Sequence, residues 1–136
     1  MLKEVANLTN AKVVLVSINS SYDNILNHKP FKGKETLLDA VQKYWPVNLD
    51  RANNADFVLG IYKNEIKVVA KIVKPWKKVF QYMSEGYFND DEEPKRDSTL
   101  LNRCAFIGEL VQDSPYLGKT LSANDKLCGP SRYINC

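Results

Sequence analysis

The chain has 136 residues, and 44% of them are hydrophobic, which is enough apolar material for the core of one domain. The formal net charge of +3 permits an anionic partner without requiring one. We therefore expect a single folded domain over residues 1–136, and the composition excludes global disorder. Because the sequence shows neither a membrane-length apolar run nor a signal peptide, we expect a cytoplasmic protein without a membrane partner.

The cysteines and the histidine offer little for metal binding. Cys104, Cys128 and Cys136 are an odd number, contain no CxxC pair, and are accompanied by one histidine, His28. A structural zinc site needs four ligands, so the sequence predicts reduced thiols, no metal and no cofactor.

The first part of the chain predicts one strand and two helices. Residues 12–18 are rich in β-formers and predict a buried strand, and the polar residues 19–24 predict a loop after it. A loop in that position often supplies ligand groups, although plain turn chemistry explains the same residues. Apolar residues at helical spacing predict a helix over 33–45 that ends before Pro46, and Asn48 predicts the N-cap of a short helix within 47–55.

Residues 56–76 predict a β-hairpin and form the centre of the fold. Both faces of its first strand are largely apolar, which is typical of a strand covered on two sides. We expect a three-residue turn over 63–65 and a second strand that ends at Pro75. The outer face of that strand is expected to be basic, through Lys67 and Lys71.

The last part of the chain predicts a charged loop followed by short elements. Residues 84–99 contain an acidic run and Pro94, so we expect a mobile, exposed insertion there. Residues 103–111 predict a strand, 113–118 a single helical turn, and 119–121 and 131–135 two short strands. The apolar spacing also predicts that seven residues share one core: Leu37, Val41, Phe57, Leu59, Val68, Ala70 and Phe106.

Several short stretches resemble a known superfamily when they are taken together. They are Trp45, Arg51-Ala52, Ala55 to Tyr62, Trp76, Arg103, Phe106 to Glu109, Tyr116 to Lys119 and Tyr133 to Cys136. In this order they resemble small bacterial and phage domains related to the PUA-like superfamily, which includes ASCH, EVE and YTH domains. The resemblance covers residues 37–136, whereas the acidic insertion and the first strand depart from the minimal pattern. It implies an α+β fold in which a small mixed or antiparallel β-barrel carries two or three short helices, and it implies a pocket for RNA, a modified base or a nucleotide.

Planar rings and cations supply the candidate binding residues. Trp45 and Trp76 can stack on a base, although large aromatic residues also fill cores. Arg51 and Arg103 can hold a phosphate or a carboxylate, and both also suit structural ion pairs. Lys119, Lys67 and Lys71 can contact phosphate, or can simply be solvated. The amide of Asn135 can read a base edge or stabilise a turn. We expect one pocket lined by Trp45, Arg51, Trp76 and Arg103, with Lys119 and Asn135 at its mouth.

Catalytic motifs are incomplete, so no catalytic residue is predicted and an enzyme is not expected. The run Leu59 to Tyr62 lacks the second half of a GIY-type nuclease motif. Gly118-Lys119-Thr120 lacks the earlier glycine of a phosphate-binding loop, because Asp113 stands there.

Two kinds of function remain open. One is non-enzymatic binding of a nucleotide or a nucleic-acid base, and the resemblance to phage domains extends this to an anti-defence role through sequestering a host nucleotide signal or masking nucleic acid. The other is inhibition of a host protein through the aromatic and acidic residues 80–93. Nucleotide that co-purifies with the protein would favour the first, and a co-purifying host protein would favour the second.

Overall fold

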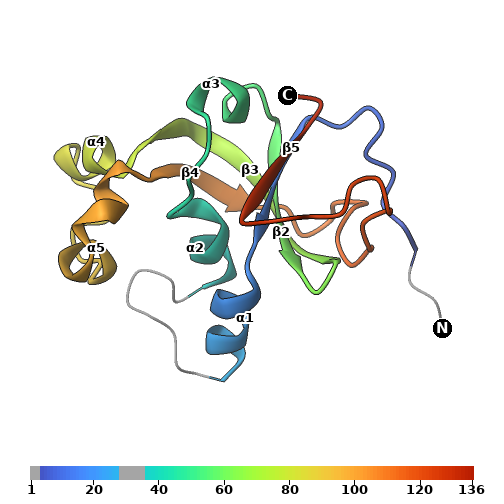
Figure 1. Cartoon of the computed structure of the whole chain (residues 1–136), viewed down its shortest axis with the longest axis horizontal. Coiled ribbons are helices and arrows are strands. Elements are labelled where there is room, and N and C mark those ends of the chain that lie inside the picture. The colour runs from blue at the N-terminus through green and yellow to red at the C-terminus, as the bar shows by residue number, and fades with distance from the viewer. Residues whose placement is uncertain (1–3, 28–35) are drawn as a thin grey trace.

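A computed structural model describes residues 4–27 and 36–136, which form an α+β fold around one five-stranded sheet (Figure 1). The strands are β1 (Val13–Ser17), β2 (Phe57–Tyr62), β3 (Glu65–Lys78), β4 (Cys104–Leu110) and β5 (Ser131–Ile134). The helices are α1 (Asn19–Leu26), α2 (Leu37–Gln42), α3 (Leu49–Ala52), α4 (Val79–Ser84), α5 (Glu93–Arg96) and the 3₁₀ helix η1 (Ser98–Asn102). None of the helices in the described ranges is both long and apolar enough to cross a bilayer.

The sheet is mixed and open. Its strand order is β4-β3-β2-β1-β5, in which β1 and β2 are parallel and the other neighbours are antiparallel. A parallel pair needs a crossover connection, and α1, α2 and α3 supply it. Because β4 and β5 are the two edges of the sheet, the strands do not close into the barrel that the PUA-like resemblance implies.

The expected single core is divided by the sheet into two. On one face, β-strand residues such as Val14, Val58 and Phe106 pack against α2 and α3, and the side chains of α1 lie against this cluster. On the other face, Leu15 and Leu59 pack against the segments that precede β1 and follow β4. Of the seven predicted core residues, Val41, Val68, Ala70 and Phe106 belong to the helix-covered core and Leu59 to the other, while Leu37 and Phe57 are half-buried at their margins.

The hairpin is confirmed, but a bulge changes which residues share a face. Gly60 pairs with Val68 and the next residue, Ile61, pairs with Ile66, so Lys67 is an extra residue in β3. Ile66 therefore joins the core opposite to that of Val68, although strict alternation placed the two on one face. Glycine suits position 60 because a Cβ atom there would lie 2.7 Å from Val41 of α2.

The turn of the hairpin has two residues instead of three. Tyr62 pairs directly with Glu65, and Lys63 and Asn64 between them have φ values of 48° and 65°. Two consecutive positive φ angles are typical of the type I′ turn, which matches the twist of the strands that it joins.

The crossover differs from its prediction in two places. Residues 19–24 belong to helix α1 and not to a loop, because Tyr22 and Ile25 pack against the helix-covered core. The helix expected over 33–45 ends at Gln42, since Trp45 leaves the helix to form a backbone bridge with Cys104 at the edge of the sheet. Residues 33–35 of that prediction, and His28, lie outside the described residues. The short helix α3 is confirmed, and Asn48 caps it by accepting a hydrogen bond from the Arg51 backbone.

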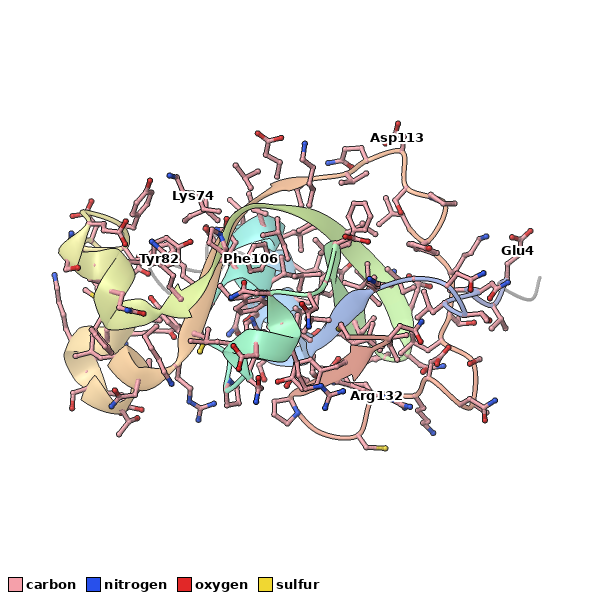
Figure 2. The ribbon with its side chains drawn as sticks, turned by 90° about the horizontal axis from the view of Figure 1, so that it is seen from above. Glu4, Lys74, Tyr82, Phe106, Asp113 and Arg132 are labelled. Carbon is pink, nitrogen blue, oxygen red and sulfur yellow. The ribbon has the colours of Figure 1, made fainter. Side chains whose placement is uncertain are left out.

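Strand β3 continues through Pro75 to Lys78, contrary to the expected end at Pro75. The proline is tolerated because the register between β3 and β4 shifts twice there, so neither Pro75 nor Trp76 has a partner in β4. β3 then leads into α4, which lies beside α5 at one end of the molecule (Figure 1). Figure 2 shows Tyr82 at this end, far from Glu4 at the opposite end, and Phe106 in the middle.

The charged segment is folded, although a mobile loop was predicted. Residues 84–99 contain α5 and the start of η1, and Asp91 and Pro94 within them are buried. A third apolar cluster holds the segment, with Tyr82 and Val79 buried at its centre. Most of its other residues are exposed, as predicted, and their mobility stays a prediction. The β4 and β5 strands are confirmed, whereas residues 113–118 form turns without a helix and residues 119–121 contribute only isolated bridges at Thr120.

Leu59→Ala should lower the free energy of unfolding by ~2–5 kcal/mol, because the Leu59 side chain is fully buried beside the centre of the sheet. Urea denaturation followed by circular dichroism measures the change. Leu110→Ala is the matched control at the sheet edge, where the residue is 39% exposed, and should cost about 1 kcal/mol or less. A loss below about 1 kcal/mol for Leu59→Ala would show that this strand is not central to the fold.

Candidate functional site

A hollow of about 250 Å³ lies at the carboxyl ends of the two parallel strands. Ser17 ends β1 and pairs with Ile61 near the end of β2, so both strands deliver their last residues to one edge of the sheet. In sheets with parallel strands this edge is where ligands bind most often. The residues that line the hollow are Ser17, Asn19, Ile61, Lys63, Asn64, Lys126, Leu127 and Gly129.

Three segments that are distant in sequence are tied together around the hollow. The hairpin turn is held to the start of α1 because the Lys63 backbone N–H donates to Asn19 Oδ1 at 3.2 Å. The final loop is held to β1 by a bond of 2.9 Å from the Ser17 N–H to the Pro130 carbonyl. Asn64 donates from its side chain to the Leu121 carbonyl at 3.3 Å. The backbone of the hollow is thus fixed before any ligand arrives.

The lining of the hollow is cationic. Lys63 and Lys126 are both exposed, and the described residues of the lining include no carboxylate. Within residues 4–27 and 36–136, neither lysine takes part in an ion pair. The amides of Asn19 and Asn64 and the hydroxyl of Ser17 add neutral polar groups. Two ammonium groups without an ion-pair partner on one concave surface attract an anion, and lysine commonly binds phosphate as a point charge.

The two tryptophans of the predicted pocket are packed inside the helix-covered core. Trp45 is 8% exposed, and its indole N–H donates to the Val41 carbonyl at 3.0 Å. Trp76 is 2% exposed and lies against Phe106, with 4.8 Å between ring centroids. Neither ring offers a free face to a ligand, so the structure favours the packing role that the sequence left as the alternative.

The other residues of the predicted pocket are dispersed. Arg51 donates from Nε to the Cys136 carbonyl at 3.0 Å and covers the ring of Tyr133, so it fixes the C-terminal residues. Arg103 lies at the end of η1, where its carbonyl accepts from the Val79 backbone. The Lys119 ammonium lies 3.5 Å from the carboxylate of Glu4. None of these residues lines the cationic hollow.

Asn135, which was expected at the mouth of the predicted pocket, has a structural role. Its amide donates to the carbonyls of Leu8, Thr9 and Ala11, at 3.1, 2.9 and 2.7 Å. The residue also lines a larger groove, of about 510 Å³, between the N-terminal segment and residues 122–125. Among the described residues, that groove carries Asp125 and no cation, and Asn7 and Ser122 of its lining already hydrogen-bond to other lining residues, so it is the weaker candidate.

The basic face expected on β3 is only partly available. Lys71 is exposed, as predicted, whereas Lys67 is half-buried and forms an ion pair with Glu65. The sequence pattern indicated residues 19–24, which include Asn19, as possible ligand groups, whereas it gave no separate binding role to the turn lysine, Lys63. Lys126 gave no local signal, because only the path of the last loop brings it to the hollow.

A second cluster of charged groups is buried and serves to hold the fold. The Lys43 ammonium lies 2.7 Å from Asp91 Oδ2 and 4.3 Å from the centre of the Phe88 ring. The Tyr44 hydroxyl donates to the same carboxylate oxygen. Burial, together with this hydrogen bond, raises the pKa of Tyr44 far above its usual range, so the hydroxyl stays a donor. With only about 3% of Lys43 and 6% of Asp91 exposed, these groups lack the access that a substrate needs.

Metal and thiol chemistry receive no support from the side chains that are described. Residues 4–27 and 36–136 contain no group of three or more histidine, cysteine or acidic side chains placed to hold a metal. The three cysteines are free, and burial raises the pKa of the Cys104 and Cys136 thiols, which lowers their reactivity as nucleophiles.

Comparisons of this chain with protein-family models, with curated proteins and with solved structures found no match. The candidate site therefore depends on its own geometry, and the PUA-like resemblance stays a prediction.

Asp91→Ala should lower the free energy of unfolding by ~3–5 kcal/mol, because it leaves the buried Lys43 ammonium without its carboxylate. It should also increase cleavage within residues 84–99 in limited proteolysis. Glu92→Ala is the matched control, since Glu92 pairs with Arg96 at 3.1 Å with both side chains exposed, and should cost about 0.5 kcal/mol or less. Equal losses for the two variants would contradict a special role for the buried pair.

Proposed function

We propose that this protein binds a nucleotide, free or as a unit of a nucleic acid, without catalysing its conversion, and that the phosphate occupies the hollow at the ends of β1 and β2. The observation that carries the proposal is the pair of ammonium groups, Lys63 and Lys126, that share a concave surface without a carboxylate. An anionic ligand in the hollow is attracted by both positive charges.

The size of the hollow supports a small ligand. Its volume of about 250 Å³ lies just below the roughly 300–1,000 Å³ that is common for small-molecule pockets. Such a volume suits a single nucleotide better than a dinucleotide cofactor. The amides of Asn19 and Asn64 can donate to phosphate oxygens or accept from a sugar hydroxyl. An anti-defence role would follow if the bound nucleotide were a host signal.

The alternative, a protein-binding inhibitor that acts through residues 80–93, receives less support. Phe80 is 48% exposed and could contact a partner. Tyr82 and Asp91 are buried, however, and Tyr87 and Phe88 pack against the third apolar cluster. Most of the aromatic residues in this segment therefore stabilise the fold and leave little apolar surface for an interface.

Lys63→Ala and Lys126→Ala should each weaken nucleotide binding by about tenfold, since each removes one charge-assisted contact to phosphate. Isothermal titration calorimetry with inorganic phosphate and with nucleoside mono-, di- and cyclic phosphates measures the dissociation constants. Lys71→Ala is the matched control, because Lys71 is an exposed lysine of β3 outside the hollow. The Lys71→Ala variant should bind phosphate and the nucleotides with the same dissociation constants as the wild type.

Three results would contradict the proposal. Unchanged affinity in both hollow variants would place the site elsewhere, and an equal loss in Lys71→Ala would indicate diffuse attraction by the whole surface. If no nucleotide or oligonucleotide binds and a host protein co-purifies instead, the inhibitor hypothesis replaces this one.

A further inference from the structure

Two tyrosines in tilted ring contact lie next to the hollow. The ring centroids of Tyr22 and Tyr62 are 4.3 Å apart, and the ring planes are inclined by 37°. Tyr62 directly precedes Lys63, and Tyr22 is three residues after Asn19 on the first turn of α1, so the pair adjoins two residues of the lining. Both tyrosines are half-buried, which leaves part of each ring at the surface.

Contacts with neighbouring residues hold both tyrosine rings in place. The Tyr62 hydroxyl donates to Asp23 Oδ1 at 2.6 Å, and Tyr22 packs against the helix-covered core. A ring held by its neighbours loses little conformational entropy when a second flat group lies against it. The pair therefore has the properties of a preformed stacking surface.

We propose that the ligand is single-stranded nucleic acid, with one nucleotide in the hollow and the adjacent base stacked on the Tyr22–Tyr62 pair. This inference depends on the proposed function, because it assigns the phosphate to the same hollow. Neither tyrosine belongs to the lining of the hollow, whose volume suits one nucleotide. When one nucleotide fills the hollow, a base on the tyrosines comes from the adjacent nucleotide, which requires a strand.

The charges around the tyrosines determine on which side the backbone of the nucleic-acid strand is expected to lie. The Lys63 ammonium lies 5.1 Å from the centre of the Tyr62 ring, and Lys63 also lines the hollow, so it can meet the phosphate that joins the two nucleotides. On the other side, the Lys67 ammonium is 5.9 Å from the Tyr22 ring but is paired with Glu65. Asp23 adds a carboxylate at the Tyr62 hydroxyl. The strand backbone is therefore favoured on the Lys63 side and the base on the rings.

Stacking also selects the form of nucleic acid. A base in a duplex has both faces covered by its neighbours, whereas a base in a single strand has a free face that an aromatic side chain can cover. The Lys63 ammonium now near Tyr62 is exposed, and such cation–π contacts are weak, so a base can displace it toward a phosphate.

The test compares ligand lengths in wild type and in Tyr62→Leu. Fluorescence competition should show that a dinucleotide and a six-nucleotide single strand bind wild type roughly fivefold or more tightly than a mononucleotide, and that a duplex of the same sequence does not. Tyr62→Leu should remove this gain and leave mononucleotide affinity unchanged, which also shows that the hollow is intact. Tyr62→Phe keeps the ring and should keep the gain, and Tyr87→Leu, at the far end beside α4, is the control.

The outcomes separate this inference from the proposed function. If a mononucleotide binds but the dinucleotide gains nothing, or if Tyr62→Leu weakens both ligands equally, the stacking surface is refuted and the nucleotide site stands. Equal affinity for duplex and single strand also refutes it. If neither nucleotides nor strands bind wild type, both proposals fail.

Discussion

The parallel pairing of β1 with β2 is the constraint on which the rest of this structure depends. A parallel pair cannot be joined by a tight turn, so the chain must cross one face of the sheet, and α1, α2 and α3 form that crossing. Helices on one face leave the other face to the segments before β1 and after β4, and two separate cores result. The same pairing brings the carboxyl ends of both strands to one edge of the sheet, where Ser17 and Ile61 line the hollow.

Local patterns in the sequence predicted most strands but not how they are arranged. The β-former run at β1, the hairpin and the alternation in β4 are properties of a few consecutive residues, and each is found at nearly its expected place. Ile66 lies on the face opposite to the one that strict alternation with Val68 gives, because a single extra residue, Lys67, reverses the alternation, and no local pattern reveals a bulge. The open sheet was missed because strand order depends on pairing between distant segments, which periodicity does not encode.

The candidate site shows the same division between local and distant information. Trp45 and Trp76 were chosen for their chemistry, but large apolar rings stabilise most when buried, and both rings lie in the core. The hollow instead uses a turn residue, Lys63, a helix-start residue, Asn19, and a loop residue, Lys126, which only the folded backbone brings together. Asn19 belongs to the polar residues that the sequence indicated as possible ligand groups, because such residues after a buried strand are common in binding sites, whereas no local pattern indicates Lys126.

The distribution of charge explains why the small net charge is a poor guide to binding. Lys43 forms a buried ion pair with Asp91. Four further cations each lie beside a carboxylate: Lys67, Lys77, Arg96 and Lys119. Across the part of the chain that the structure describes, Lys63 and Lys126 have no such partner, yet they share one concave surface. Paired charges largely cancel beyond a few ångströms, while two like charges over a hollow reinforce each other. The sum over all charges therefore says little about binding, and what distinguishes Lys63 and Lys126 from other cations outside these ion pairs, such as Lys71, is that both line one hollow beside neutral polar groups.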